Sequence, residues 1–266
     1  MTTKITYLPI TKDLQEDGQS WDNRSNFFIN MHTRQDRVDQ IKDFVQFVQE
    51  HNLAKAGDHT LDIGCGTGDY AIGLAHMGAC PTGIDLSKGM IEGAKQLANK
   101  EGLFLSLYQG AWSEATRQSL HWDKTFNLAY SIFCPIMYDI DNLLAMTRAS
   151  RGRRLLIAFK TRTDKIVDSL SQAFYGHKAF PWNDACANSI QGLKDAGYTP
   201  EVITKVIPTE EVLSLNEATK YFSMRIHVNT MSHDAIQDRV RKLLLPQVKN
   251  GVITNENVDT VNYIMW

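Results

Sequence analysis

The stretch LDIGCGTGDY, residues 61–70, decides the fold of this chain. HTLDIG over residues 59–64 predicts a short buried strand, and DYAIGLAHMG over residues 69–78 predicts a helix that ends at a glycine. Between them, glycines stand at every second position, Gly64, Gly66 and Gly68, after the acid Asp62. A strand, a glycine-rich turn and a helix N-terminus together form a nucleotide site, because absent side chains let a ligand approach the backbone.

The spacing of the glycines separates two classes of nucleotide ligand. Dinucleotide sites use G-x-G-x-x-G, whereas here Asp69 stands at the position of the third glycine. The carboxylate of Asp62 would also repel a pyrophosphate, but it suits a ligand that carries an ammonium group. S-adenosylmethionine carries an α-ammonium and a sulfonium, so the stretch favours this ligand over NAD.

Strands and helices alternate outward from this stretch. Further apolar strands are predicted over residues 80–87, 103–108, 126–133 and 153–160, and helices over residues 36–50, 88–102 and 141–150. This alternation predicts an α/β fold, in which a parallel sheet is covered by helices on both faces.

The pattern loosens after Lys160. Residues 174–184, FYGHKAFPWND, are typical of an insertion, and residues 199–207 predict an edge strand among helices over 184–198, 216–226 and 233–245. An alternating stretch over 259–266 predicts a last strand. We expect one domain over residues 1–266, made of an N-terminal helical cap or lid over 1–50, a cofactor-binding core over 51–160, and the rest of the sheet with helical insertions over 161–266.

Composition limits the classes of function. The chain has 266 residues, of which 43% are hydrophobic and 22% charged, and its formal net charge is −2. This balance favours neither nucleic acid nor a membrane as a partner. The four cysteines and eight histidines show no metal or redox spacing, and no signal peptide or membrane-spanning stretch is visible. We therefore expect free thiols, no metal site and a cytoplasmic protein.

Three motifs taken together resemble one family. LDIGCGTG, GIDLS over residues 83–87 and LSKGM over residues 86–90 are similar to motifs of the class I S-adenosylmethionine-dependent methyltransferases, in their small-molecule branch. The similarity extends over residues 61–160. It implies S-adenosylmethionine as cofactor and a Rossmann-like sheet of seven mostly parallel strands. The strand over 259–266 would then run antiparallel between the fifth strand and the edge strand at 199–207.

The resemblance also implies roles for single residues. Asp85 ends the second strand, where the family keeps an acid that accepts hydrogen bonds from both ribose hydroxyls. Leu86 and Met90 lie where the family packs the adenine ring, and we interpret Cys65 as a small apolar filler rather than a nucleophile. The expected cofactor-binding set is Asp62, Gly64, Cys65, Gly66, Gly68, Asp85, Leu86, Met90, Ala111, Trp112 and Ser131.

Two positions depart from the family pattern, and the one at Asn127, where many members have an aspartate, is peripheral to the cofactor. After the third strand an acid often reads the adenine amino group, but Ala111 stands at this position. Adenine recognition could instead rest on backbone groups, on Trp112 or on Glu114. Trp112 itself fits a place in the core as well as a place in the wall of the adenine site.

Two segments could line the acceptor side of the site. Residues 131–139, SIFCPIMYD, follow the fourth strand at the carboxyl edge of the sheet, where ligands bind, although a structural loop would also explain them. Residues 20–28, SWDNRSNFF, could fold over the cofactor as a lid, or form a surface helix. The candidates are Ser131, Cys134, Pro135 and Tyr138 in the first segment, and Trp21, Asp22 and Arg24 in the second.

These observations predict a methyltransferase that acts on a small-molecule acceptor by in-line displacement, as a monomer or homodimer. Such an enzyme needs no obligatory catalytic side chain, and Tyr138 and Asp22 are the catalytic candidates. Extra segments over residues 161–185 and 205–257 can roof a pocket. The alternative is a non-catalytic protein that binds S-adenosylmethionine or S-adenosylhomocysteine as a sensor or scaffold.

Overall fold

The computed structural model describes residues 2–177, 185–226, 228 and 230–266, and its contacts divide the chain into two compact units. The first unit comprises Met1–Ala158, Ala187–Ile203 and Tyr263–Trp266, and the second comprises Phe159–Cys186 and Thr204–Asn262. The sequence predicts one domain over residues 1–266. The contacts place most of the segments that we interpret as insertions in the second unit. Residues 178–184 of these segments lie outside the described residues.

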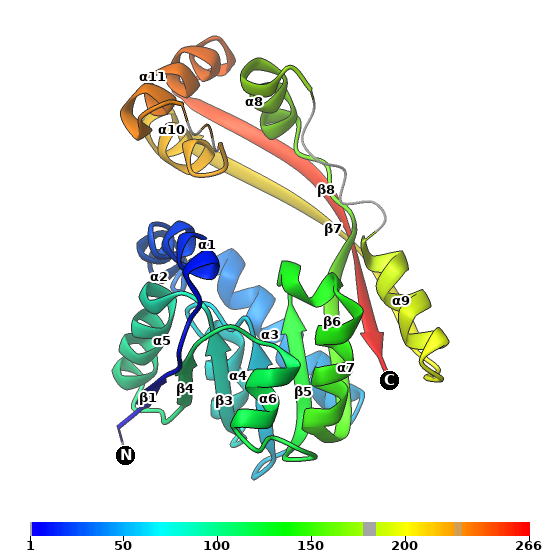
Figure 1. The fold of residues 1–266 in the computed structure, drawn as a ribbon. Coiled ribbons are helices and arrows are strands. Elements are labelled where there is room, and N and C mark those ends of the chain that lie inside the picture. The colour runs from blue at the N-terminus through cyan, green and yellow to red at the C-terminus, as the bar shows by residue number, and fades with distance from the viewer. Residues whose placement is uncertain (1, 178–184, 227, 229) are drawn as a thin grey trace. The chain divides into compact units, whose positions relative to one another are not determined.

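In the described part of the chain, the strands form one sheet with the order β1-β4-β3-β2-β5-β6-β8-β7 (Figure 1). From β1 to β6 neighbouring strands are parallel, and β8 runs in the opposite direction between β6 and β7. The predicted fold class and the place of the last strand are therefore confirmed. The strands are β1 (Lys4–Tyr7), β2 (His59–Ile63), β3 (Cys80–Asp85), β4 (Ser106–Gln109), β5 (Phe126–Ile132), β6 (Ser150–Thr161), β7 (Glu201–Ser214) and β8 (Val252–Met265).

The number of strands differs from the prediction, since the described residues contain eight and not seven. The extra strand is β1, which pairs in parallel with β4 from Lys4 opposite Ser106 to Tyr7 opposite Gln109. Only Ile5 of its four residues is partly buried, and four residues are too few to show the apolar alternation that marks a longer strand. Its backbone covers the edge that β4 would otherwise expose.

Helices cover both faces of the sheet in the first unit (Figure 1). The helices that follow β2 and β3 begin where local sequence dictates. Helix α4 starts directly after Gly68, whose left-handed φ of 78° ends the glycine turn, and α5 starts after Ser87, whose hydroxyl accepts a hydrogen bond from the Met90 amide. The helices are α1 (Lys12–Asp22), α2 (Ser25–Met31), α3 (Gln35–Glu50), α4 (Asp69–His76), α5 (Lys88–Lys100), α6 (Glu114–Ser119), η1 (Pro135–Tyr138), α7 (Ile140–Ala149), α8 (Lys165–Tyr175), α9 (Ala185–Asp195), α10 (Leu215–Ser223), α11 (His233–Leu244) and η2 (Leu245–Gln247).

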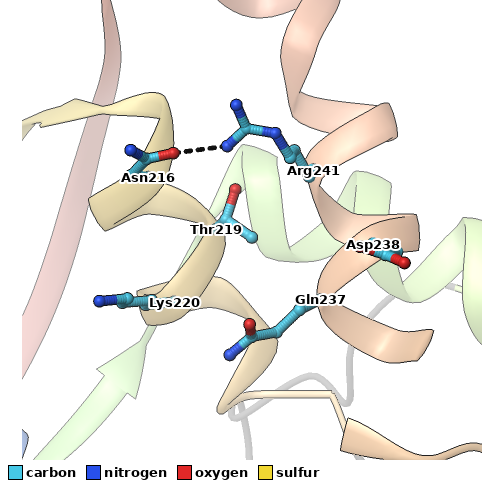
Figure 2. A pocket seen from close by; sticks show the side chains of 6 residues that line it. All are labelled: Asn216, Thr219, Lys220, Gln237, Asp238 and Arg241. Atoms are coloured by element: carbon cyan, nitrogen blue, oxygen red, sulfur yellow. Dashed lines mark hydrogen bonds between the residues drawn. The ribbon is translucent and has the colours of Figure 1, made fainter. Parts of the chain in front are cut away.

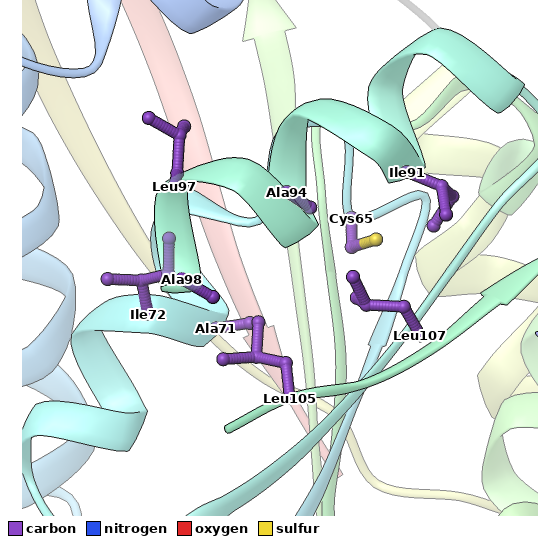
Figure 3. Close-up of a cluster of buried hydrophobic side chains, with 9 residues drawn as sticks. All are labelled: Cys65, Ala71, Ile72, Ile91, Ala94, Leu97, Ala98, Leu105 and Leu107. Carbon is purple, nitrogen blue, oxygen red and sulfur yellow. The ribbon is translucent and has the colours of Figure 1, made fainter. Parts of the chain in front are cut away.

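A cluster of buried side chains fixes α4 and α5 against β4 (Figure 3). Its small members let the elements approach closely, because a Cβ at Gly68 would lie only 3.0 Å from the Cβ of Ala94. Each large aliphatic member contributes about 1.5–3 kcal/mol through its burial. The cluster comprises Cys65, Ala71, Ile72, Ile91, Ala94, Leu97, Ala98, Leu105 and Leu107.

The second unit has a hydrophobic core of its own. Side chains from α8, α10, α11 and β8 pack together, and a capping box between Ser214 and Glu217 starts α10. This separate core explains why the contacts divide the chain in two. Its buried members are Ile166, Leu170, Ala218, Phe222, Ile226, Ile236, Val240, Leu244 and Ile253.

Candidate functional site

The glycine loop joins the carboxyl end of β2 to the start of α4, and its three glycines all have positive φ. The angles are 72° at Gly64, 53° at Gly66 and 78° at Gly68. A Cβ at Gly64 would lie 2.4 Å from the Sγ of Cys134, whereas a Cβ at Gly66 would meet nothing within 4 Å. Packing therefore requires a glycine at position 64, while Gly66 faces open space that a ligand can use.

Cys65 turns away from this open space. Its side chain is buried in the cluster below the loop, and its amide, like that of Gly64, donates to the carbonyl of Ile84. Burial raises the pKa of the Cys65 thiol well above its ordinary value. These contacts agree with a small filler and give no support to a nucleophile.

Asp62 is the buried acid of the site. It is 2% exposed, and its Oδ2 has no hydrogen-bond partner among the described residues; the hydroxyl of the adjacent Tyr130 has none either. Burial raises the pKa of Asp62 to about 8, the nearby Tyr130 hydroxyl opposes this rise, and the charge of Asp85 adds to it. A buried carboxylate oxygen without a hydrogen-bond partner lowers the stability of the folded state, so a bound cation that donates hydrogen bonds would stabilise Asp62.

Asp85 ends β3 and binds two backbone amides. Its Oδ1 accepts from the amide of Ser87 at 2.8 Å, and its Oδ2 accepts from the amide of Gly66 at 2.9 Å. Burial raises the pKa of Asp85, although both amides oppose the rise. Each carboxylate oxygen can accept a further hydrogen bond, so the side chain can still receive a diol.

Two of the expected adenine-side residues are part of the protein interior. Met90 is 3% exposed on α5, and Trp112 is 5% exposed. The indole Nε1 of Trp112 donates to the carbonyl of Asn142 at 3.1 Å, and its ring stacks on Trp122. Of the two interpretations of Trp112, the structure favours the core position.

Other groups on the expected adenine side already have partners within the protein. Glu114 forms ion pairs with Arg117 and Arg148, and the hydrogen bond from Arg117 lowers its pKa to about 2. The carbonyl of Ala111 accepts from Thr116 Oγ1, and that of Leu86 accepts from the side chain of Gln109. Glu114 is thus bound to guanidinium groups.

The acceptor-side candidates differ in how they are held. Ser131 is fully buried, and its hydroxyl donates to the carbonyl of Ile63 at 2.7 Å, which ties β5 to β2. Cys134 lies against Gly64, and burial raises the pKa of its thiol to about 12. Exposed Pro135 begins η1, and half-buried Tyr138 ends it. Tyr138 is therefore the catalytic candidate that is placed at this edge.

Asp22, the other catalytic candidate, binds the start of α5. Its Oδ1 accepts from the hydroxyl of Ser87 at 2.5 Å and from the amide of Gly89 at 2.8 Å. It therefore caps the N-terminus of α5, which begins beside Asp85. In the same segment, the guanidinium of Arg24 stacks over the ring of Trp21.

Sequence reasoning missed several groups around the loop. Tyr130 lies opposite Asp62 in the pairing of β2 with β5, which only the register reveals. His32, Arg37 and Glu101 surround the start of α4, but none of them belongs to a motif. One feature of the sequence could have indicated charged partners here. Asp69 is an acid in the first turn of a predicted helix, where a negative charge is favourable.

A polar pocket of about 210 Å³ lies between α10 and α11 in the second unit (Figure 2). Arg241 donates to Asn216 at 2.6 Å across it, and the remaining lining residues are Thr219, Lys220, Gln237 and Asp238. Within the described residues, no group of three or more His, Cys, Asp or Glu side chains is arranged to hold a metal ion. No helix of the described chain is long and apolar enough to cross a membrane.

Comparison with known proteins identifies part of the chain. Residues 60–152 match the family model of a methyltransferase domain. An O-methyltransferase of Aspergillus sclerotiorum, resE, is 36% identical over 111 residues, which are 40% of this chain and 40% of the relative. The ubiquinone biosynthesis O-methyltransferase of Coxiella burnetii is 41% identical over 54 residues, 20% of this chain and 23% of the relative. The chain spans less than half the length of these curated relatives.

A solved structure from Bacillus halodurans C-125 has the same fold. Its TM-score is 0.52 at 13% identity, over 83% of this chain and 97% of that chain. The matched domain contains the glycine loop, Asp62 and Asp85, which are the residues that carry the motif resemblance. Residues 60–152 are therefore a methyltransferase domain, and its motifs resemble those of the class I S-adenosylmethionine-dependent methyltransferases.

Proposed function

We propose that the first unit binds S-adenosylmethionine at the glycine loop and that the protein transfers its methyl group to a small-molecule acceptor. One observation carries this proposal. The Oδ2 atom of Asp62 is buried without a hydrogen-bond partner among the described residues, next to a loop in which Gly66 faces open space. An ammonium group would satisfy this carboxylate, and a pyrophosphate would not.

The residues present fit the parts of the cofactor. Asp62 would hold the ammonium group, the start of α4 would hold the carboxylate with its free amides, and Asp85 would hold the ribose hydroxyls. Leu86 would line the adenine side. S-adenosylmethionine, when bound, supplies a methyl group that its sulfonium already activates.

The protein contributes mainly position and the exclusion of water. Holding the acceptor in line with the transferred group can lower the barrier by about 7–11 kcal/mol. The segment over residues 133–139 supports such a wall, since Cys134 packs directly on the loop. Tyr138 remains the candidate for orienting an acceptor or accepting its proton, because the Oδ1 of Asp22 is bound to α5.

The relatives suggest which acceptor to test first. Both named relatives are O-methyltransferases, so we propose a hydroxyl group on a small molecule as the acceptor class. We further propose a cytoplasmic monomer or homodimer.

Two measurements test this function. Calorimetry should show binding of S-adenosylmethionine and S-adenosylhomocysteine and no binding of NAD. Transfer of a labelled methyl group to a panel of hydroxyl, amine and thiol compounds should then show turnover, first with hydroxyl compounds. Binding without transfer to any of these acceptors would favour the non-catalytic sensor or scaffold, and binding of NAD alone would overturn both readings.

A further inference from the structure

A histidine links three elements around the start of α4. His32 follows α2, and its Nδ1 lies 2.6 Å from Oδ1 of Asp69, the first residue of α4. Its Nε2 lies 2.6 Å from Oε1 of Glu101, directly after α5. The side chain of His32 is 11% exposed and that of Asp69 is 1% exposed, so solvent screens the inner pair little.

The two contacts of the imidazole ring bear on the protonation of His32. Both ring nitrogens face carboxylate oxygens, which accept hydrogen bonds. A neutral imidazole has one N–H only, so one nitrogen would meet an acceptor without a proton between them. These contacts therefore favour an imidazolium, which donates on both sides.

Other charged groups complete the cluster. The Nε of Arg37 donates to Oδ2 of Asp69 at 2.7 Å, and its NH1 donates to the hydroxyl of Tyr70 at 3.1 Å. On the outer side, Nε2 of His76 lies 2.5 Å from Oε2 of Glu101. Both oxygens of Asp69 are thus held by cations, one from each side.

The cluster acts on the glycine loop through the backbone. Asp69 directly follows Gly68, and the first amides of α4 have no acceptor within the helix. A shift of the Asp69 carboxylate would move these amides, which are the groups offered to an anionic part of the ligand. The contacts of His32 therefore bear on binding although the residue itself lies outside the loop.

We propose that His32 is a positioning residue, which as an imidazolium between Asp69 and Glu101 holds the start of α4 in the geometry that binds the cofactor. The inference rests on the proposed binding of S-adenosylmethionine at the loop. The new element is that the affinity for this ligand depends on the protonation of His32, which does not contact the ligand.

The direction of the pH dependence follows from the charges. The hydrogen bond to Asp69 raises the pKa of His32, burial opposes the rise, and Glu101 adds to it. The contribution of His32 is therefore fully present below the ordinary histidine pKa of about 6.5 and is lost as the pH rises through the raised value. Burial alone would raise the pKa of Asp69, but His32 and Arg37 outweigh it and lower that pKa, so the carboxylate stays charged throughout this range.

The test compares three variants with the wild-type protein. Calorimetry with S-adenosylhomocysteine, from about pH 6 to about pH 9, measures the affinity of wild type, His32→Gln, Glu101→Gln and His233→Gln. Taking each affinity relative to that of His32→Gln removes the pH dependence of other groups, such as Asp62. The wild-type advantage should be about tenfold at the acid end and should vanish at the alkaline end.

The other two variants test the outer partner of His32 and a distant histidine. Glu101→Gln removes one negative charge beside His32, so the loss of affinity should begin at a lower pH than in the wild type. His233→Gln changes an exposed histidine at the start of α11 in the second unit, outside the cluster, and should follow the wild-type profile. NMR of the imidazole nitrogens should also show His32 with protons on both nitrogens at neutral pH, which needs no variant to fold.

The outcomes distinguish this inference from the function on which it rests. Wild-type binding with the same pH profile in His32→Gln, or a neutral His32 ring at neutral pH, would overturn the positioning role and leave the proposed function intact. A folded wild-type protein that binds S-adenosylhomocysteine at no pH would overturn both.

Discussion

At the scale of single residues, two glycines of the loop show how packing and function can be told apart. Gly64 and Gly66 both have a left-handed backbone, which costs other residues about 1–2 kcal/mol. Only Gly64 has a neighbour in the way of a side chain, namely Cys134. Packing of the protein therefore requires a glycine at position 64, whereas no packing contact requires one at position 66.

We predict that Gly64→Ala lowers the melting temperature strongly and that Gly66→Ala lowers it less, by the cost of the left-handed backbone alone. The reason is that the new methyl group at position 64 would lie 2.4 Å from the sulfur of Cys134. Gly66→Ala should instead lose affinity for S-adenosylhomocysteine, because its methyl group would occupy the ligand space. Thermal unfolding and calorimetry on both variants check this. Equal effects on stability and full binding by Gly66→Ala would contradict it.

Asp85→Asn should weaken the binding of S-adenosylhomocysteine by roughly one to two decades. A hydrogen bond to a charged acceptor contributes about 1.5–3 kcal/mol, and Asp85 would offer several of them to the ribose. Asp39→Asn on α3 removes the same charge at an exposed position and serves as the matched control. If both variants bind like the wild type, the carboxylate of Asp85 does not hold the ribose.

Asp62 should release a proton when the ligand binds. Its pKa of about 8 makes the side chain neutral at pH 7, and an ammonium partner favours the charged form. We expect about one proton to be released per ligand at pH 7, and affinity to rise with pH up to about 8. Calorimetry in two buffers of different ionisation enthalpy gives the number of protons, and Asp62→Asn should release fewer. Equal proton release by both proteins would argue against ionisation of Asp62.

The same shift affects stability without ligand. A carboxyl group whose pKa is higher in the folded state stabilises that state less as the pH rises from about 4 to about 8, because the folded protein retains the proton longer. Its effect on folding thus opposes its effect on binding.

At the scale of elements, the N-terminal segment depends on close contacts with α5. A Cβ at Gly93 would lie 2.8 Å from Ile29 on α2, and one at Gly89 would lie 2.8 Å from the hydroxyl of Ser25. Together with the bonds of Asp22 to α5, these contacts place α1 and α2 beside the strand end that carries Asp85. The segment is thus placed where a lid would have to act.

Gly93→Ala should therefore loosen α2, and Gly93→Ala combined with Ile29→Ala should restore it. The single variant adds a methyl group against Ile29, and the second change removes the side chain that it meets. Hydrogen exchange over residues 15–31 should rise in the single variant and return toward the wild type in the double variant. In the wild type, S-adenosylhomocysteine should increase protection there if the segment closes over the ligand. If neither the substitution nor the ligand changes hydrogen exchange over residues 15–31, this segment does not contribute to the site.

The elements also show how far sequence alone can reach. The buried strands and amphipathic helices of residues 59–160 were predicted because apolar spacing reports directly on burial. Short elements carry too few residues for such a pattern, so β1 and α6 were missed. The role of Asp22 depends on a bond to Gly89 across 67 residues, and the charge of His32 depends on partners from two other helices. Neither follows from local spacing.

At the scale of the whole molecule, two hydrophobic cores lie along one chain. The first holds the glycine loop and the second holds α8, α10 and α11. Strand β8 contributes residues to both units, with Val252–Asn262 in one and Tyr263–Met265 in the other. Since β8 lies between β6 and β7, its last residues complete the interior of the sheet rather than its edge.

Removal of residues 258–266 should therefore prevent native folding. The side chains of Val261, Ile264 and Met265 are buried, and Trp266 donates to the hydroxyl of Thr147 at 2.8 Å. Burial of each apolar side chain contributes about 1.5–3 kcal/mol, so three of them amount to a large part of the 5–15 kcal/mol that typically stabilises a protein.

Removal of residues 1–9, an equal number at the other end, provides the comparison. It takes away β1, an edge strand in which only Ile5 is partly buried, so the loss of stability should be smaller. Circular dichroism and urea unfolding of both truncated proteins measure the difference. A C-terminal truncation that stays soluble with wild-type stability would show that β8 does not hold the sheet together. In that case the position of β8 between β6 and β7 would have to be abandoned as the organising feature of this fold.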